Sequence, residues 1–117
     1  MTVNEIRNLV VNELEALKAI DIRVLDVAGL TTFTDIIIIA SGNTDRQVRA
    51  LANRIVESAK SNNLKPLGTE GKEEGDWALI DLGDIVVNIM RPETRDYYQL
   101  EKLWSAESDQ HNTSLQP

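Results

Sequence analysis

Apolar residues recur at helical spacing in two segments of the chain. The first segment follows Thr2 and Glu5, which have the spacing of a capping box at the start of a helix. The second follows Thr44 and Gln47, which repeat that spacing. Both segments predict an amphipathic helix with one buried face. The buried stripes are expected to consist of Ile6, Leu9, Val10, Leu14 and Leu17 in the first helix and of Val48, Leu51, Ala52, Ile55 and Ala59 in the second.

Other segments have the composition of strands. Residues 22–27 favour a strand that turns near Gly29. Residues 36–40 are all apolar and almost all β-branched, which predicts a strand in the middle of a sheet with both faces covered. Residues 66–75 hold three glycines and predict a short edge strand or a loop.

A β-hairpin is predicted in the following segment, from Trp77 to Asp81 and from Asp84 to Met90. The connection between these strands is assigned to Leu82-Gly83, where glycine supplies the unusual backbone angles of a tight turn. Leu82 is therefore expected to be exposed. The second strand places Ile85, Val87 and Ile89 on one face, and this apolar set is expected to face the core.

The last predicted helix begins near Pro92 and runs through Tyr98 and Leu100 to Trp104. The complete order α-β-β-α-β-β-β-α predicts an α+β fold, with helices packed on a mixed β-sheet. Residues 1–104 are expected to form a single domain. Residues 105–117 offer almost nothing to bury and predict a disordered tail.

The charge of the chain argues against a broad nucleic-acid-binding surface. Nineteen acidic residues against twelve basic ones give a formal net charge of −7, whereas affinity for nucleic acid rests largely on Lys and Arg. This balance suits a basic protein partner, although from charge alone a merely soluble surface is the simpler explanation. The apolar run 36–40 is too short to span a membrane, and the N-terminus lacks the pattern of a secretion signal. A cytoplasmic protein is expected.

Catalytic chemistry finds few candidate residues. There is no cysteine, and the only histidine, His111, lies in the predicted tail, which cannot hold a general base in place. Ser41 has no folded histidine to activate it. Clustered carboxylates could hold magnesium, so a metal-dependent nucleotidyltransferase, or an inactive relic of one, is the alternative. That family carries Gly-Ser at a helix start and Asp-x-Asp on the next strand, whereas this chain has Ser41-Gly42 and no strand with Asp-x-Asp. We therefore expect no catalytic residue, cofactor or metal.

Four of the five aromatic residues lie between Trp77 and Trp104. Large rings anchor both cores and interfaces. Tyr97 and Trp104 follow helical spacing with Leu100 and are expected to pack on the sheet. Trp77 begins its strand at the sheet margin, Leu82 is placed in the turn and Tyr98 falls beside the helical stripe. These three residues are expected to form an exposed patch that binds a partner.

In this region and elsewhere the sequence resembles the Iojap-like ribosomal silencing factors, and the resemblance covers residues 4–105. The matching strings are Leu25-Asp26-Val27, Thr34-Asp35 with the isoleucine run, Ser41-Gly42 with Arg46-Gln47-Val48, Glu70-Gly71, Asp76-Trp77, Asp81-Leu82-Gly83-Asp84-Ile85-Val86-Val87 and Leu100-Glu101-Lys102-Leu103-Trp104. One departure is Asn88, where many members have histidine.

The resemblance implies a nucleotidyltransferase-like fold without the transferase motif. It implies binding to the large ribosomal subunit through its protein fourteen, which blocks joining to the small subunit and lowers translation when nutrients are scarce. The contact residues that it implies are Trp77, Leu82 and Tyr98. Little direct contact with nucleic acid is expected, and a homodimer is expected when no ribosome is present. An acidic rim of Asp76, Asp81, Asp84 and Glu101 would complement a basic ribosomal protein.

Overall fold

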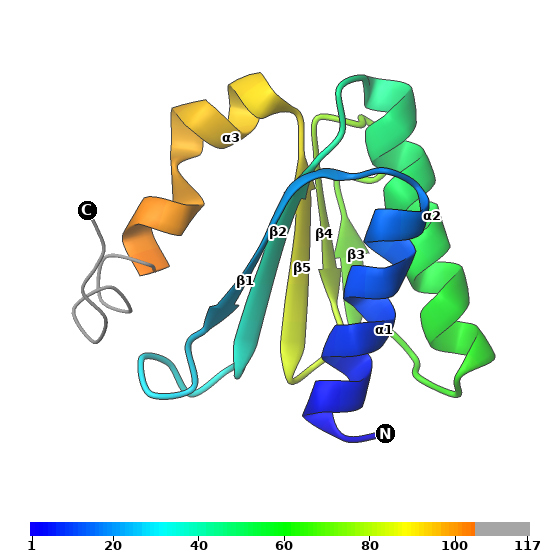
Figure 1. Ribbon diagram of the computed structural model, residues 1–117, viewed down its shortest axis with the longest axis vertical. Coiled ribbons are helices and arrows are strands. Elements are labelled where there is room, and N and C mark those ends of the chain that lie inside the picture. The colour runs from blue at the N-terminus through cyan, green and yellow to red at the C-terminus, as the bar shows by residue number, and fades with distance from the viewer. Residues whose placement is uncertain (105–117) are drawn as a thin grey trace.

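The computed structural model describes residues 1–104 and contains the eight predicted elements in the predicted order (Figure 1). The predicted tail, with His111, lies outside the described residues. The elements are α1 (Val3–Ala16), β1 (Ile20–Asp26), β2 (Ile36–Ser41), α2 (Asp45–Ser61), β3 (Gly68–Glu70), β4 (Trp77–Asp81), β5 (Ile85–Met90) and α3 (Pro92–Tyr98).

The strands form one mixed sheet in the order β1-β2-β5-β4-β3. β2 and β5 are parallel, and the other neighbouring pairs are antiparallel. Every residue of β2 is buried, so the prediction of a strand covered on both faces is confirmed. β3 is a short edge strand. The α+β fold predicted from the sequence is therefore confirmed.

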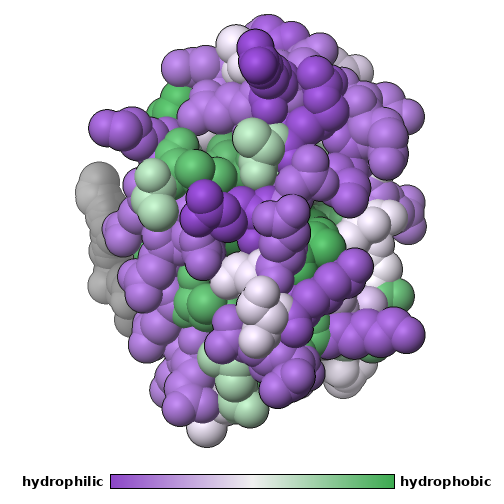
Figure 2. Space-filling view, turned by 90° about the vertical axis from the view of Figure 1, so that its right-hand side faces the viewer, coloured by the Kyte–Doolittle hydropathy of each residue, from purple (hydrophilic) through white to green (hydrophobic). Residues whose placement is uncertain are grey.

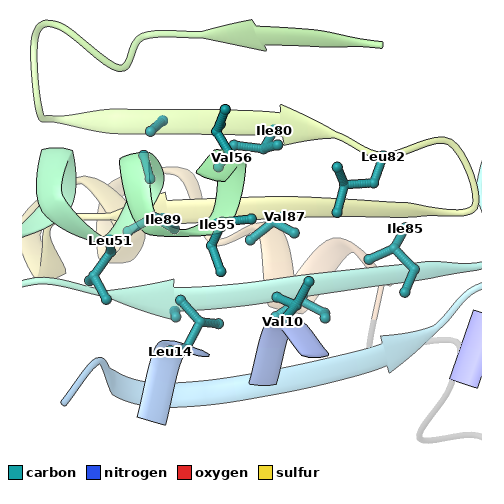
Figure 3. Close-up of a cluster of buried hydrophobic side chains, with 14 of the residues drawn as sticks. Val10, Leu14, Leu51, Ile55, Val56, Ile80, Leu82, Ile85, Val87 and Ile89 are labelled. Atoms are coloured by element: carbon teal, nitrogen blue, oxygen red, sulfur yellow. The ribbon is translucent and has the colours of Figure 1, made fainter. Parts of the chain in front are cut away.

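Helices α1 and α2 cover one face of the sheet. Their buried side chains meet alternate residues of β2, β4 and β5 in an aliphatic core cluster (Figure 3). Thr2 forms the predicted capping box with Glu5, and the Thr44 hydroxyl accepts a hydrogen bond from the Gln47 amide at 3.0 Å. Ile85, Val87 and Ile89 all face this cluster, as their alternation predicted.

The turn of the β4–β5 hairpin lies one residue later than the sequence indicated. The amide of Leu82 donates to the carbonyl of Ile85 at 2.9 Å, so Gly83 and Asp84 form the connection. Gly83 has φ +89° at the first turn position, where type II′ turns place glycine. Leu82 thus remains in the strand ladder, on the same face as Ile80, and is only 9% exposed. The expectation that Leu82 is exposed is wrong.

The opposite face of the sheet is covered only in part. A second, smaller core cluster contains Val27, Ile37, Ile39 and Met90, with Leu25, Leu30, Trp77, Leu100 and Trp104 packed against it. Trp104 is half-buried there, and its ring lies edge-on to Phe33 with centroids 6.4 Å apart. The expected core packing of Trp104 is therefore confirmed in part.

The last helix is interrupted, whereas the sequence predicted one continuous helix to Trp104. α3 ends at Tyr98, Gln99 has φ +52°, and residues 100–104 form a separate helical segment at an angle to it (Figure 1). The residue of α3 that faces the protein interior is Arg95. Tyr97 follows it by two positions, about 200° around the helix, and is 80% exposed. The expectation that Tyr97 packs in the core is wrong.

Candidate partner-binding surface

Three aromatic rings gather where the start of β4 meets α3. The rings of Trp77 and Tyr98 have centroids 4.9 Å apart, and those of Tyr98 and Tyr97 are also 4.9 Å apart in an edge-on arrangement. Trp77 is half-buried, Tyr98 is 54% exposed and Tyr97 is 80% exposed. We call these residues the aromatic cluster. It offers a large apolar area on the incompletely covered face of the sheet.

The indole of Trp77 is held in a fixed orientation. Its Nε1–H donates to the Oδ1 of Asn88 at 2.9 Å, and Asn88 is itself buried on the neighbouring strand. Gly71 has φ +74°, and a Cβ at that position would lie 2.0 Å from the carbonyl oxygen of Trp77. The loop before β4 can therefore approach the Trp77 backbone only because residue 71 is glycine.

Asp76 links the start of β4 to α3. Its Oδ1 accepts a hydrogen bond from the hydroxyl of Thr94, and its backbone carbonyl accepts one from the Arg91 amide at 3.1 Å. Its side chain remains exposed. Asp76 thus lies beside Trp77 in space as well as in sequence, and it contributes negative charge at the edge of the aromatic cluster.

Arg95 anchors α3 to the rest of the molecule. It is 7% exposed, and its Nε and Nη2 donate to the two carboxylate oxygens of Glu101, each at 2.9 Å. Its Nη1 donates to the Oγ of Ser41 at 2.9 Å and to the Ile20 carbonyl at 3.5 Å, and Asp21 lies 3.7 Å from Nη2. The charged hydrogen bonds from Arg95 lower the pKa of Glu101 below its usual value.

The predicted site residues form two separate groups, whereas the sequence predicted a single surface. Asp76, Trp77 and Tyr98 lie together at the start of β4. Asp81 and Leu82 lie at its other end, about 13 to 16 Å from Trp77 along a strand that rises about 3.3 Å per residue. There the Asp81 carboxylate accepts a hydrogen bond from the Gly83 amide at 2.8 Å, and Asp84 is exposed. Glu101 belongs to neither group, because its carboxylate is held by Arg95.

The carboxylates give no metal centre within the described residues. No group of three or more His, Asp or Glu side chains is placed to share an ion between residues 1 and 104. Asp45 pairs with Arg91 at 3.1 Å. No helix in this part of the chain has the length and apolar character that a membrane span needs.

A shallow groove lies beside Trp77. It has a volume of about 320 Å³ and is lined by Glu70, Gly71, Trp77 and Leu79. No binding role was predicted from the sequence for Glu70, Leu79 or Arg95. The alternation of β4 places Leu79 on the same face of the strand as Trp77, but the position of Glu70 depends on the pairing of β3 with β4.

The outer side of α2 differs from the aromatic cluster. This side of the molecule, on the right in Figure 1, is mostly hydrophilic, and hydrophobic residues show there only in separate small areas (Figure 2). The larger apolar side chains of α2 turn inward to the first core cluster. The aromatic cluster is therefore the better candidate for contact with a partner.

The sequence matches known proteins along most of its length. A family model described as "Ribosomal silencing factor during starvation" matches residues 1–117. The chain is 42% identical over 107 residues to a ribosomal silencing factor of Chromobacterium violaceum, covering 92% of this chain and 88% of that protein. It is 35% identical over 104 residues to the mouse protein named mitochondrial assembly of ribosomal large subunit protein 1, covering 86% of this chain and 46% of that protein.

Solved structures agree with these matches. A crystal structure of a Chromobacterium violaceum protein superposes with a TM-score of 0.88 at 43% identity, covering 90% of this chain and 88% of the other. A crystal structure of a Bacillus halodurans protein gives a TM-score of 0.80 at 37% identity, covering 86% and 94%. The nucleotidyltransferase-like description of the fold is compatible with this architecture and stays a prediction. On the family match and these identities, the chain belongs to the ribosomal silencing factor family.

Proposed function

We propose that this protein represses translation by binding the large ribosomal subunit through its protein fourteen. Membership of the ribosomal silencing factor family supports association with the ribosome. The name of the mouse relative refers to the large subunit, which supports the choice of subunit. The proposed site of action is the cytoplasm, and the proposed occasion is nutrient limitation.

The observation that carries the proposal is the aromatic cluster. Its rings are packed against one another and against β4, yet two of them remain more than half exposed. Because the rings already pack against one another, covering them with a partner costs less side-chain conformational entropy than covering isolated rings. Buried aromatic anchors of this kind contribute more than about 2 kcal/mol each to many interfaces.

The remaining predicted contacts extend this surface. Asp76 adds negative charge beside the rings, and Asp81 and Asp84 add it at the far end of the hairpin. With the net charge of −7, these carboxylates favour a basic partner. Leu82 can offer a partner only the small exposed part of its side chain, and Glu101 acts first as the partner of Arg95.

The proposed mechanism is steric. A protein that occupies the joining face of the large subunit prevents the small subunit from docking, and this requires neither a reaction nor a cofactor. Without a ribosome, the same apolar rings offer a surface on which two copies of the chain pair.

Trp77→Ala tests the proposal. Cosedimentation with separated ribosomal subunits should give comigration of the wild type with the large subunit and fewer joined particles. The variant should bind the large subunit about 30-fold more weakly, which corresponds to the loss of about 2 kcal/mol from one anchor. Leu103→Ala is the control, because Leu103 is exposed but outside the proposed surface.

Thermal melting separates binding from folding. If Trp77→Ala melts far below the wild type, Trp77 acts mainly in the core and its assignment to the docking surface fails. Tyr98→Ala then repeats the test with a ring that is more than half exposed. Wild-type protein that does not comigrate with the large subunit would refute the proposed function.

A further inference from the structure

The groove beside Trp77 combines apolar walls with one carboxylate. β3 and β4 are antiparallel, and Glu70 pairs directly with Leu79. Directly paired residues project from the same face of a sheet, with Cβ atoms about 5 Å apart. Leu79 and Trp77 are two residues apart on β4 and share that face. Glu70, Leu79 and Trp77 therefore surround one groove on the face opposite α1 and α2.

The walls of this groove are preorganised. The hydrogen bond to Asn88 fixes the indole of Trp77, and Tyr98 packs against its ring. Gly71, which also lines the groove, has a backbone conformation that side-chain-bearing residues rarely adopt. A ligand side chain would thus enter a site whose shape is set before binding, which lowers the entropy cost of association.

The charge at the rim is available to a partner. Glu70 is exposed, and it takes part in none of the ion pairs between side chains of residues 1–104. A carboxylate beside an apolar groove suits a side chain with an apolar stem and a cationic end. Tryptophan is the aromatic residue that attracts cations most strongly through its ring face.

We infer that the groove receives a lysine or arginine side chain of the protein partner. The stem of that side chain lies along Leu79, and its cation interacts with the ring of Trp77 and the carboxylate of Glu70. This inference rests on the proposed function and adds to it the chemistry of one contact. It makes Glu70 a specificity-determining residue for a basic partner.

Charge substitutions at Glu70 test the inference. Glu70→Gln should weaken binding to isolated large ribosomal subunits about fivefold, and Glu70→Lys should weaken it more than about tenfold. Glu74→Gln and Glu74→Lys are matched controls, because Glu74 is exposed in the loop that follows β3, carries the same charge and does not line the groove. The control variants should change affinity less than about twofold, since they alter only the long-range field.

The possible outcomes distinguish a failure of this inference from a failure of the proposed function. If the Glu70 and Glu74 variants behave alike while Trp77→Ala still weakens binding, the groove does not receive a cation, although the docking surface remains. If Glu70→Leu tightens binding, the occupant is an apolar side chain and the inference is wrong. If wild-type protein does not bind the large subunit, the inference and the proposed function fall together.

Discussion

The two faces of the sheet are built by different means. On the face covered by α1 and α2, aliphatic side chains from both helices fill the space over β2, β4 and β5 (Figure 3). On the other face, α3 contributes no buried apolar residue and is attached through the guanidinium of Arg95. The first face is closed by the hydrophobic effect, and the second is held in part by directional polar contacts.

This difference gives the two faces separate roles: the first stabilises the fold, and the second positions the exposed aromatic rings. Burial of aliphatic groups is non-directional and scales with area, so it supplies most of the folding free energy. A bidentate arginine fixes an orientation, because its planar donors match a carboxylate in only a few geometries. The second face can therefore leave Tyr97 and Tyr98 exposed while Tyr98 still packs against both Trp77 and Tyr97.

The largest expected effect tests the assignment of residues to the two faces. Leu82→Ala should lower the free energy of unfolding by about 3 kcal/mol, because Leu82 is buried in the first core cluster. Leu79→Ala is the control on the same strand and should cost about 1 kcal/mol or less, since Leu79 is only half-buried on the other face. Urea unfolding measures both. A stable Leu82→Ala variant with weak subunit binding would instead place Leu82 on the docking surface.

An intermediate effect is expected at the polar anchor. Arg95→Ala should reduce stability by about 2 kcal/mol, because it removes the charged hydrogen bonds to Glu101 and the bond to Ser41. It should also weaken binding to the large subunit, because α3 then no longer holds Tyr98 against Trp77. Arg95→Lys keeps the positive charge but not the planar set of guanidinium donors. It should therefore restore only part of the stability and part of the subunit binding. Unchanged subunit binding by the folded variant would show that the anchor does not position the rings.

The smallest expected effect is a difference in pH dependence. Arg95 lowers the pKa of Glu101, so the stabilisation from ionised Glu101 is complete above the ordinary pKa of the unfolded carboxyl group and disappears as the pH falls through the lower folded pKa. Glu101→Gln should therefore be less stable than the wild type at pH 6, and the gap should narrow at more acidic pH.

Glu13 gives a comparison on the first face. Hydrogen bonds from Arg54 and Ser58 lower its pKa and join α1 to α2. The stability gap between Glu13→Gln and the wild type should also narrow at acidic pH, but only Glu101→Gln should weaken subunit binding. A constant stability gap between Glu101→Gln and the wild type from pH 6 to pH 2 would contradict the assigned cause of the pKa shift.

The sequence predicts the structure accurately where the determining interactions are local. The capping residues Thr2 and Thr44 place the starts of α1 and α2, because their hydroxyls bond amides three residues away. The alternation of Ile85, Val87 and Ile89 identifies the buried face of β5 for a similarly local reason. The rings of Trp77 and Tyr98 lie 4.9 Å apart, and their role in binding a partner stays a prediction.

The predictions for Leu82 and Tyr97 are wrong because a local change in the backbone altered the direction of each side chain. A shift of the hairpin turn by one residue moves Leu82 from the connection into the ladder and buries it. The left-handed conformation of Gln99 ends α3 early, so the helical spacing that joined Tyr97 to Leu100 no longer applies. Neither effect is visible in the apolar pattern alone.

The sequence by itself determined the order of the elements, the identity of the main core and the family to which the chain belongs. These depend on residue type and on spacings of a few residues. Only the tertiary structure decided that Glu70 faces Leu79 and that Arg95 reaches Ser41, 54 positions away in the chain. Such contacts depend on strand register and helix placement, which arise from the packing of the whole molecule.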